Sequence, residues 1–210
     1  MVNRLQRRLQ RRPSPKGQGD SYRKEVARKL FHAGAMLGTV LASAFIFQVY
    51  GMDMMKQFLL AVLVLVLVTE WLVIDIGMYV PIYRELERAN ERHRMHGSAY
   101  CLIGALLAIE FFSLRIAFVA TMMVALTDVV TGLIGRKWGR HKLIGPKTIE
   151  GTLSGLLVNL LIGTILLPSH IGIAMAVTAT VVEASVNIVD DNLAVPVMAG
   201  FVGQMLLYHL

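Results

Sequence analysis

The chain has 210 residues, 55% of them hydrophobic, with a mean hydropathy of +0.59 and a formal net charge of +7. Its apolar residues fall in long blocks instead of alternating patterns, which excludes a soluble globular domain and predicts an all-α, polytopic membrane protein. The single cysteine, Cys101, excludes a disulfide framework and any cysteine-based metal site. Because it lies within an apolar block, we expect Cys101 to fill the core. The lipid bilayer is the expected partner, and nucleic acid is not.

The first residues form a basic segment without the uninterrupted apolar stretch of a signal peptide. We expect residues 1–22 to be a flexible cytoplasmic tail and residues 23–210 to be a single transmembrane domain. Leu5 and Leu9 lie four residues apart among arginines, so a short helix on anionic lipid is the alternative to disorder.

The apolar blocks predict about seven membrane-spanning helices. Residues 30–50 and 58–80 each reach the roughly 20 residues that cross a hydrocarbon core. Residues 98–134 would form a helix of about 55 Å against a core of roughly 30 Å, so we expect a break near residues 112–115. The remaining sequence divides at two polar turns into spans over 155–167, 171–189 and 193–207.

The placement of Lys and Arg predicts the orientation of these spans, because cytoplasmic flanks attract positive charge. With seven spans, all of the 21 Lys and Arg residues except Lys56 and Arg115 fall on one side. We therefore expect the N-terminus in the cytoplasm and the C-terminus outside. The interior cytoplasmic segments are then residues 81–98 and 135–151.

The first of these segments mixes Glu with Arg at three- and four-residue spacing over residues 82–97. This pattern predicts a solvated helix that extends the second span. The alternative is that Arg94 and His96 face the same site as the second cytoplasmic segment.

Acidic residues inside apolar spans are costly and usually mark function. Asp128, Asp190 and Asp191 lie near the predicted cytoplasmic ends of their spans, together with Asp75. Glu183, Asn187 and the Asp190–Asp191 pair follow helical spacing, so we expect them to share one face of the sixth span.

Two further acids within the spans do not belong to this cytoplasmic group. Glu110 lies five residues from Arg115 near the predicted outer break, and we expect these two side chains to pair. Glu70 lies close to the middle of the second span, and the sequence assigns it no role.

Residues 135–151 contain five Lys or Arg and four Gly. Carboxylates at the mouth of a bundle, opposite such a segment, suit a magnesium ion that carries a polyphosphate, because the acids hold the metal and the bases hold the phosphates. Glycines permit close backbone approach, and residues 147–150 open the next helix, whose free N–H groups favour an anion. The pattern therefore predicts a nucleotide-phosphate clamp, with ordinary flanking charge as the alternative. It is not a Walker loop, because Pro146 separates Gly145 from Lys147.

Three segments, RKLFHAG (28–34), DVVTGLIGRKWGRHKLIGPKTIEGTLSG (128–155) and VEASVNIVDDNLAVP (182–196), resemble the polytopic CTP-dependent lipid kinases. These include dolichol, phytol and farnesol kinases and the CTP-dependent diacylglycerol kinase. The middle segment alone is also similar to CDP-diacylglycerol synthases, whereas the first and third resemble the kinase branch.

The resemblance implies transfer of the γ-phosphate of CTP to the hydroxyl of a membrane lipid alcohol at the cytoplasmic face, with Mg²⁺ or another divalent cation. A CDP-lipid synthase that uses CTP and a phosphorylated lipid is the alternative, and a transporter is a remote one. The lipid hydroxyl is expected to arrive from the bilayer beside the sixth span.

Roles follow for individual residues. Catalytic roles are expected for His32, Asp128, Glu183, Asp190 and Asp191, and metal ligation for Asp128, Glu150, Asp190 and Asp191. Nucleotide binding is expected for Arg28, Lys29, Gly135, Arg136, Lys137, Gly139, Lys142, Lys147, Thr148 and Gly151. Membrane anchoring is the alternative for Arg28 and Lys29. Asn192 and Pro196 are expected to shape the turn before the last span, and the spacing of Gly34 and Gly38 is compatible with a homo-oligomer.

Overall fold

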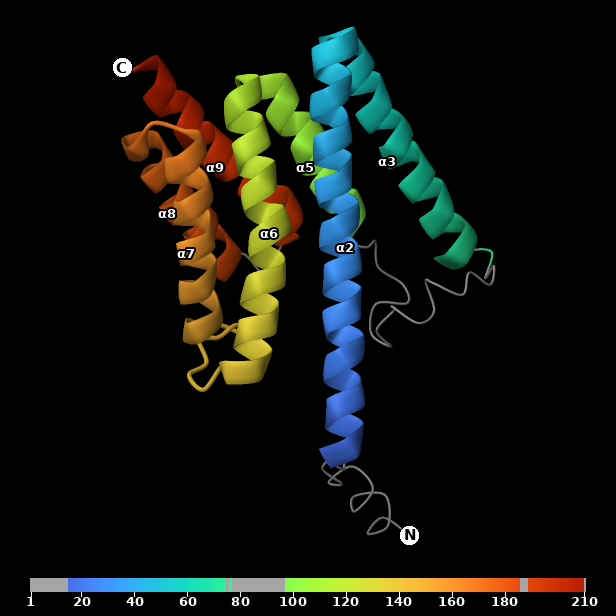
Figure 1. Cartoon of the computed structure of the whole chain (residues 1–210), viewed down its shortest axis with the longest axis vertical. Coiled ribbons are helices and arrows are strands. Elements are labelled where there is room, and N and C mark those ends of the chain that lie inside the picture. Colours follow the sequence, from blue (N-terminus) through green and yellow to red (C-terminus); the bar gives the residue numbers. More distant parts are fainter. Residues whose placement is uncertain (1–14, 75, 77–96, 186–188, 210) are drawn as a thin grey trace.

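The computed structural model describes residues 15–74, 76, 97–185 and 189–209. In these residues the regular structure is α-helical, apart from one isolated antiparallel bridge between Lys142 and Thr148. The helices, drawn in Figure 1, are α2 (Pro15–Tyr50), α3 (Met52–Ile74), α5 (Gly97–Phe111), α6 (Leu114–Trp138), α7 (Ile149–Leu166), α8 (Ser169–Ser185) and α9 (Asp191–Tyr208).

Four of the described helices are long and apolar enough to cross a membrane, namely Val26–Tyr50 within α2 and the whole of α3, α6 and α7. The apolar helices α5 and α8 are shorter, at about 22 and 26 Å against a core of about 30 Å. The predicted helical membrane bundle is therefore confirmed. Seven crossings, the cytoplasmic N-terminus and the outside C-terminus stay predictions.

Successive described helices run in alternating directions, so the first turn of α2 and the last turn of α9 lie at opposite ends of the molecule (Figure 1). Helix α2 begins at Pro15, so residues 15–22 are helical, and the division of the chain into a tail of residues 1–22 and one transmembrane domain stays a prediction. Residues 1–14 and the predicted helix over 82–96, with Arg94 and His96, lie outside the described residues, as does Asp75.

The predicted breaks between spans are confirmed where the structure describes them. Helices α5 and α6 separate at residues 112–113, where the backbone N–H of Ser113 donates to Oε1 of Gln204 at 2.6 Å. Helix α8 ends at Ser185 and α9 begins at Asp191, so Glu183 and the Asp190–Asp191 pair do not share one helical face. Asn187 lies outside the described residues.

Helix α6 is the central helix of the bundle, since 56% of its most apolar window is buried, against 11% for α3. Helices α7 and α8 approach each other closely at two glycines: a Cβ added to Gly163 would lie 2.5 Å from the carbonyl oxygen of Gly172. The core cluster around Met123 and Met175 contains residues from α2, α5, α6, α7, α8 and α9, and Cys101 belongs to it at 1% exposure, which confirms its predicted core position.

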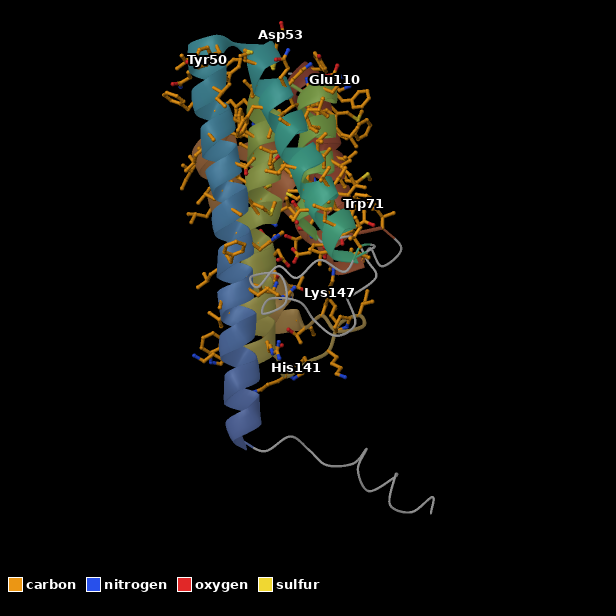
Figure 2. The ribbon with its side chains drawn as sticks, turned by 90° about the vertical axis from the view of Figure 1, so that its right-hand side faces the viewer. Tyr50, Asp53, Trp71, Glu110, His141 and Lys147 are labelled. Carbon is orange, nitrogen blue, oxygen red and sulfur yellow. The ribbon has the colours of Figure 1, made fainter. Side chains whose placement is uncertain are left out.

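One end of the bundle carries an ion pair that differs from the predicted one. Lys56 Nζ lies 2.5 Å from Glu110 Oε2, and Arg115 Nε instead donates to the carbonyl oxygen of Leu166 at 2.9 Å. The expected pairing of Glu110 with Arg115 is therefore wrong, because the packing of α3 against α5 brings Lys56 to Glu110. Figure 2 shows Glu110 at this end and Lys147 toward the other.

Candidate functional site

A cavity of about 440 Å³ lies where residues from α2, α6, α7, α8 and α9 meet, which is within the usual size range of ligand pockets. Its wall contains three basic and three acidic side chains, so we call it the polar cavity. It is lined by Lys29, Asp128, Thr131, Gly132, Gly135, Arg136, Pro146, Lys147, Thr148, Gly151, Thr152, Glu183 and Asp191.

The first ion pair in the wall joins α2 to α6. Lys29 Nζ donates to Oδ1 of Asp128 at 2.9 Å and to the Asp128 carbonyl oxygen at 2.5 Å. The Lys29 side chain is only 11% exposed, and it passes across Gly132, where an added Cβ would lie 2.2 Å from Nζ. Glycine at position 132 thus leaves the space that a buried lysine needs to reach the aspartate.

The second ion pair joins the segment before α7 to the start of α9. Lys147 Nζ lies 3.0 Å from Oδ2 of Asp191 and also donates to the carbonyl oxygen of Glu183. The carboxylate of Glu183 accepts a hydrogen bond of 2.8 Å from Thr131 Oγ1. Three acids from three helices, Asp128, Glu183 and Asp191, therefore face two lysines in one cavity.

Gly135, Gly139 and Gly151 lie where α6 approaches the start of α7, and Gly135 and Gly151 also line the polar cavity, so their approach to phosphate stays a prediction. Thr148 is the N-cap of α7, and its Oγ1 accepts from the Gly151 N–H at 3.2 Å. A Cβ on Gly135 or Gly139 would lie 2.8 Å from Thr148 Oγ1, and one on Gly151 would lie 2.8 Å from the Thr131 carbonyl oxygen. Small residues here let α6 and α7 converge on Thr148.

Several predicted site residues lie outside the polar cavity. Lys142 is exposed in the short hairpin whose turn contains Gly145 with φ of 57°, and Lys137 stacks 4.3 Å from the ring centroid of Trp138. Their side chains are thus on the surface of the hairpin and the adjoining helix end. Arg136, in contrast, lines the cavity, while Arg28 is half-buried on α2 and does not.

Glu150 also does not line the cavity. Its carboxylate lies 2.8 Å from His141 Nδ1 and accepts from the His141 backbone N–H, so it braces the hairpin against α7. The structure therefore does not bring Glu150 together with Asp128 and Asp191.

Asp190 forms the N-cap of α9 instead of lining the cavity. Its Oδ1 accepts from the backbone N–H of Asn192 at 3.0 Å and from Asn192 Nδ2 at 2.8 Å. Burial raises the pKa of the Asp190 carboxyl, a shift that the hydrogen bonds from Asn192 oppose. Pro196 lies inside α9, buried against Gly104 of α5, so its expected place in the turn is wrong.

His32 lies at the edge of this region, on α2. Its Nε2 is 3.9 Å from the position that a Cβ on Gly97 would take, and the same position lies 2.7 Å from Asn192 Nδ2. His32, Gly97 and Asn192 therefore meet where the first turns of α5 and α9 reach α2.

The polar cavity fits a magnesium ion that is bound together with phosphate. Among residues 15–74, 76, 97–185 and 189–209, no three His, Cys, Asp or Glu side chains are grouped closely enough to hold a metal by themselves. Mg²⁺ is usually held by one or two carboxylates plus substrate phosphates. Asp128 and Asp191 supply two carboxylates in a cavity that also has cations for phosphate.

Some residues of the site were missed by sequence reasoning. Thr131 holds Glu183, Gly132 accommodates Lys29, and Asn159 links Thr127 to Thr180 by bonds of 2.6 and 3.1 Å beneath the cavity. The signal that singled out the acids, a polar side chain within an apolar span, would also have found Asn159. No sequence signal indicates which lysine crosses Gly132.

These features define a helical membrane protein with a cavity lined by charged side chains toward one end of the bundle. A comparison with known proteins agrees: the chain is 31% identical over 187 residues to a phytol kinase from Synechocystis sp., covering 82% of this chain and 75% of the relative. The chain belongs to the phytol kinase family, and this membership supports an enzyme of the kinase type. No family model and no solved structure matches the chain.

Proposed function

We propose that the protein is a CTP-dependent lipid kinase that transfers the γ-phosphate of CTP to the hydroxyl of a membrane lipid alcohol at the cytoplasmic face. The observation that carries this proposal is the pairing of Lys29 with Asp128 and of Lys147 with Asp191 in the wall of one cavity. Family membership adds the reaction class, since the relative is a phytol kinase.

The two ion pairs suit a ligand that carries negative charge on its phosphates and positive charge on a bound metal ion. A triphosphate offers oxygens to Lys29 and Lys147, and Asp128 and Asp191 would hold the magnesium ion that is bound with it. Arg136 at the cavity wall adds a third cation. Magnesium would neutralise charge on the phosphates when it is bound. The protein's own side chains position the substrates and stabilise the remaining charge.

Phosphoryl transfer needs positioning and charge stabilisation more than covalent chemistry. The hydroxyl oxygen of the lipid bonds to the γ-phosphorus, the bond from that phosphorus to the β–γ bridging oxygen breaks, and CDP leaves. Glu183, held by Thr131, takes the role of orienting the hydroxyl and accepting its proton. Lys29 and Lys147 stabilise the charge that develops on the phosphate oxygens.

Among the lipid alcohols, an isoprenoid such as phytol is the preferred acceptor in this proposal, because the relative is a phytol kinase. Dolichol-type polyprenols and diacylglycerol are the alternatives. All three present one hydroxyl on an apolar body, so the polar cavity would catalyse the same phosphorylation of a hydroxyl in each case.

A product assay tests the proposal. Purified protein in lipid is incubated with magnesium, CTP labelled in its γ-phosphate and, in separate reactions, phytol, dolichol, diacylglycerol and phosphatidic acid. The proposal predicts label in the lipid fraction and release of CDP with an alcohol acceptor. Release of pyrophosphate with phosphatidic acid, and no labelled alcohol, would instead identify a cytidylyltransferase. Asp128→Asn serves as the inactive control in the same preparation.

A further inference from the structure

A second cavity, of about 140 Å³, lies among α2, α3, α5 and α6 and is separate from the polar cavity. No side chain in its wall is charged, and we call it the apolar cavity. It is lined by Ala35, Met36, Thr39, Val40, Ser43, Leu59, Val62, Val66, Ser98, Cys101, Leu102, Ala105, Ile109, Ala117, Phe118 and Thr121.

Three of the four hydroxyls in this wall are bonded to their own helices, and the fourth, on Ser98, lies at the start of α5. Thr39 Oγ1 donates to the Ala35 carbonyl oxygen at 2.9 Å, and Thr121 Oγ1 donates to the Ala117 carbonyl oxygen at 2.8 Å. Ser43 Oγ donates to the carbonyl oxygen of its own helix at position 40, at 2.8 Å. Because these three donors are satisfied, the wall beyond Ser98 presents an apolar surface that suits a hydrocarbon chain.

The two cavities are aligned along two different helices. On α2, Lys29 lines the polar cavity and Met36 lines the apolar one, and on α6 the same relation holds for Asp128 and Thr121. Seven residues are two helical turns, so each pair lies on one face of its helix, about 10 Å apart. The apolar cavity therefore continues the polar cavity along the bundle axis.

His32 lies between the two cavities. It is three residues beyond Lys29 and four before Met36, and its ring reaches the start of α5 at Gly97, next to the cavity residue Ser98. A polar side chain at this level is suited to the head of a molecule whose tail is apolar. The apolar cavity then runs outward along α5 from Ser98 to Ile109, about 16 Å at 1.5 Å per residue.

We infer that the apolar cavity is the binding subsite for the part of the substrate's single apolar chain nearest the hydroxyl, with His32 at the level where the chain ends and the hydroxyl enters the polar cavity that contains Glu183. This inference rests on the proposed lipid kinase function. It places the chain between α2, α5 and α6, on the opposite side of α6 from the expected approach beside α8. A void of about 150 Å³ holds a molecule the size of benzene, so this subsite takes only the first part of the chain, and the remainder lies in the bilayer.

Two threonines make a matched test. Thr39 lines the apolar cavity and Thr164 of α7 is exposed away from both cavities, yet each donates to the carbonyl oxygen four residues earlier, at 2.9 and 2.7 Å. Thr39→Phe fills the cavity, and Thr164→Phe adds the same ring to the outer surface. We expect Thr39→Phe to raise the KM for phytol by about tenfold or more, equivalent to about 1.4 kcal/mol of lost binding. The KM for CTP, and both KM values of Thr164→Phe, stay within about twofold of the wild type.

A second measurement uses the wild-type protein and does not depend on turnover. Phytol carrying a photoreactive diazirine in the chain near its hydroxyl is added to the protein in lipid, irradiated, and the labelled peptides are mapped. Labels on α2, α5 and α6 at the residues of the apolar cavity support the inference, and labels confined to α8 and α9 overturn it.

The two proposals fail in different ways. If the wild type labels at the apolar cavity but phosphorylates no lipid alcohol, the subsite stands and the kinase proposal fails. If phytol is phosphorylated but Thr39→Phe and Thr164→Phe behave alike, the kinase proposal stands and the subsite fails. Should Thr39→Phe not fold, Ala35→Phe, from an exposed position in the same wall, is compared with Thr164→Phe in its place.

Discussion

Lysine–carboxylate pairs occur at both ends of the bundle, but their surroundings differ. Near the α2–α3 turn, Lys56 and Glu110 pair at 2.5 Å with side chains that are 36% and 60% exposed. Toward the other end, the side chains of Lys29 and Asp128 are 11% and 35% exposed. The first pair joins neighbouring helices at the rim, whereas the second lines a cavity and shares it with a second pair and a further acid.

The difference shows how to tell a functional charge from a structural one when both are paired. An exposed ion pair contributes between nothing and about 1 kcal/mol, so losing Lys56–Glu110 changes little. Removing one partner of a poorly hydrated pair leaves an uncompensated charge and is much more costly. Asp128 and Lys29 occupy such a site next to unfilled space, which favours a ligand of mixed charge as the reason for keeping them there.

The largest effect is expected from breaking the pairs in the polar cavity. Asp128→Asn and Lys147→Met each remove one charge while keeping much of the side-chain shape. Turnover of CTP with phytol is expected to fall by about 100-fold or more, because preorganised charges at a phosphoryl group are worth that much. A loss of less than about threefold in either variant would contradict the proposed roles. Steady-state kinetics of purified protein in lipid provides the measurement.

A smaller effect is expected from displacing Lys29 without removing its charge. Gly132→Ala places a Cβ where Lys29 Nζ now lies, at 2.2 Å, and so pushes the ammonium away from Asp128. We expect the KM for CTP to rise by about tenfold, equivalent to about 1.4 kcal/mol. Gly38→Ala is the matched control, since a Cβ at that glycine meets nothing within 4 Å. Equal KM values in the two variants would refute the packing argument.

A loss of several-fold in turnover is expected from Thr131→Val, which keeps the shape of the side chain but removes the hydrogen bond to Glu183. The KM for CTP should change less than kcat, because the bond positions a group that acts on the lipid hydroxyl. Thr69→Val is the control at a half-buried position of α3, where the hydroxyl donates to the Leu65 carbonyl oxygen of its own helix. If kcat is the same for both variants, Glu183 does not depend on Thr131.

The smallest effect is expected at the opposite end. Lys56→Met should leave turnover within about twofold and lower the free energy of unfolding by at most about 1 kcal/mol, because its pair is exposed. Turnover and thermal unfolding in the same lipid preparation check this. A large loss of turnover in Lys56→Met would mean that the two ends do not differ as described.

The helical class and the helix breaks could be predicted from the sequence, because apolar blocks and polar turns are local features. Ser113 and Pro168 stand at or next to observed helix ends, and Thr148 is the cap of α7. The approximate place of the site was also predictable, since buried charge within a span is rare. Asp128 and Glu183 are predicted from this signal, and Lys147 from the basic segment of residues 135–151. All three line the polar cavity.

The pairing of charges and the second cavity could not be predicted in this way. Whether Glu110 meets Arg115 or Lys56 depends on how α3 packs against α5, and the sequence alone does not fix that packing. Asp190 and Asp191 are adjacent in the chain, yet one caps a helix and the other faces Lys147. The apolar cavity is built from ordinary membrane-helix residues such as Ala105, whose type carries no signal of a void.

The most direct test of the central claim measures binding of magnesium–CTP to the wild type, Lys147→Met and Lys56→Met, by calorimetry of the purified proteins in lipid. If the polar cavity holds the triphosphate, Lys147→Met binds at least about tenfold more weakly than the wild type, whereas Lys56→Met binds like the wild type. Equal affinities for all three proteins would contradict the account, because the nucleotide would then bind elsewhere.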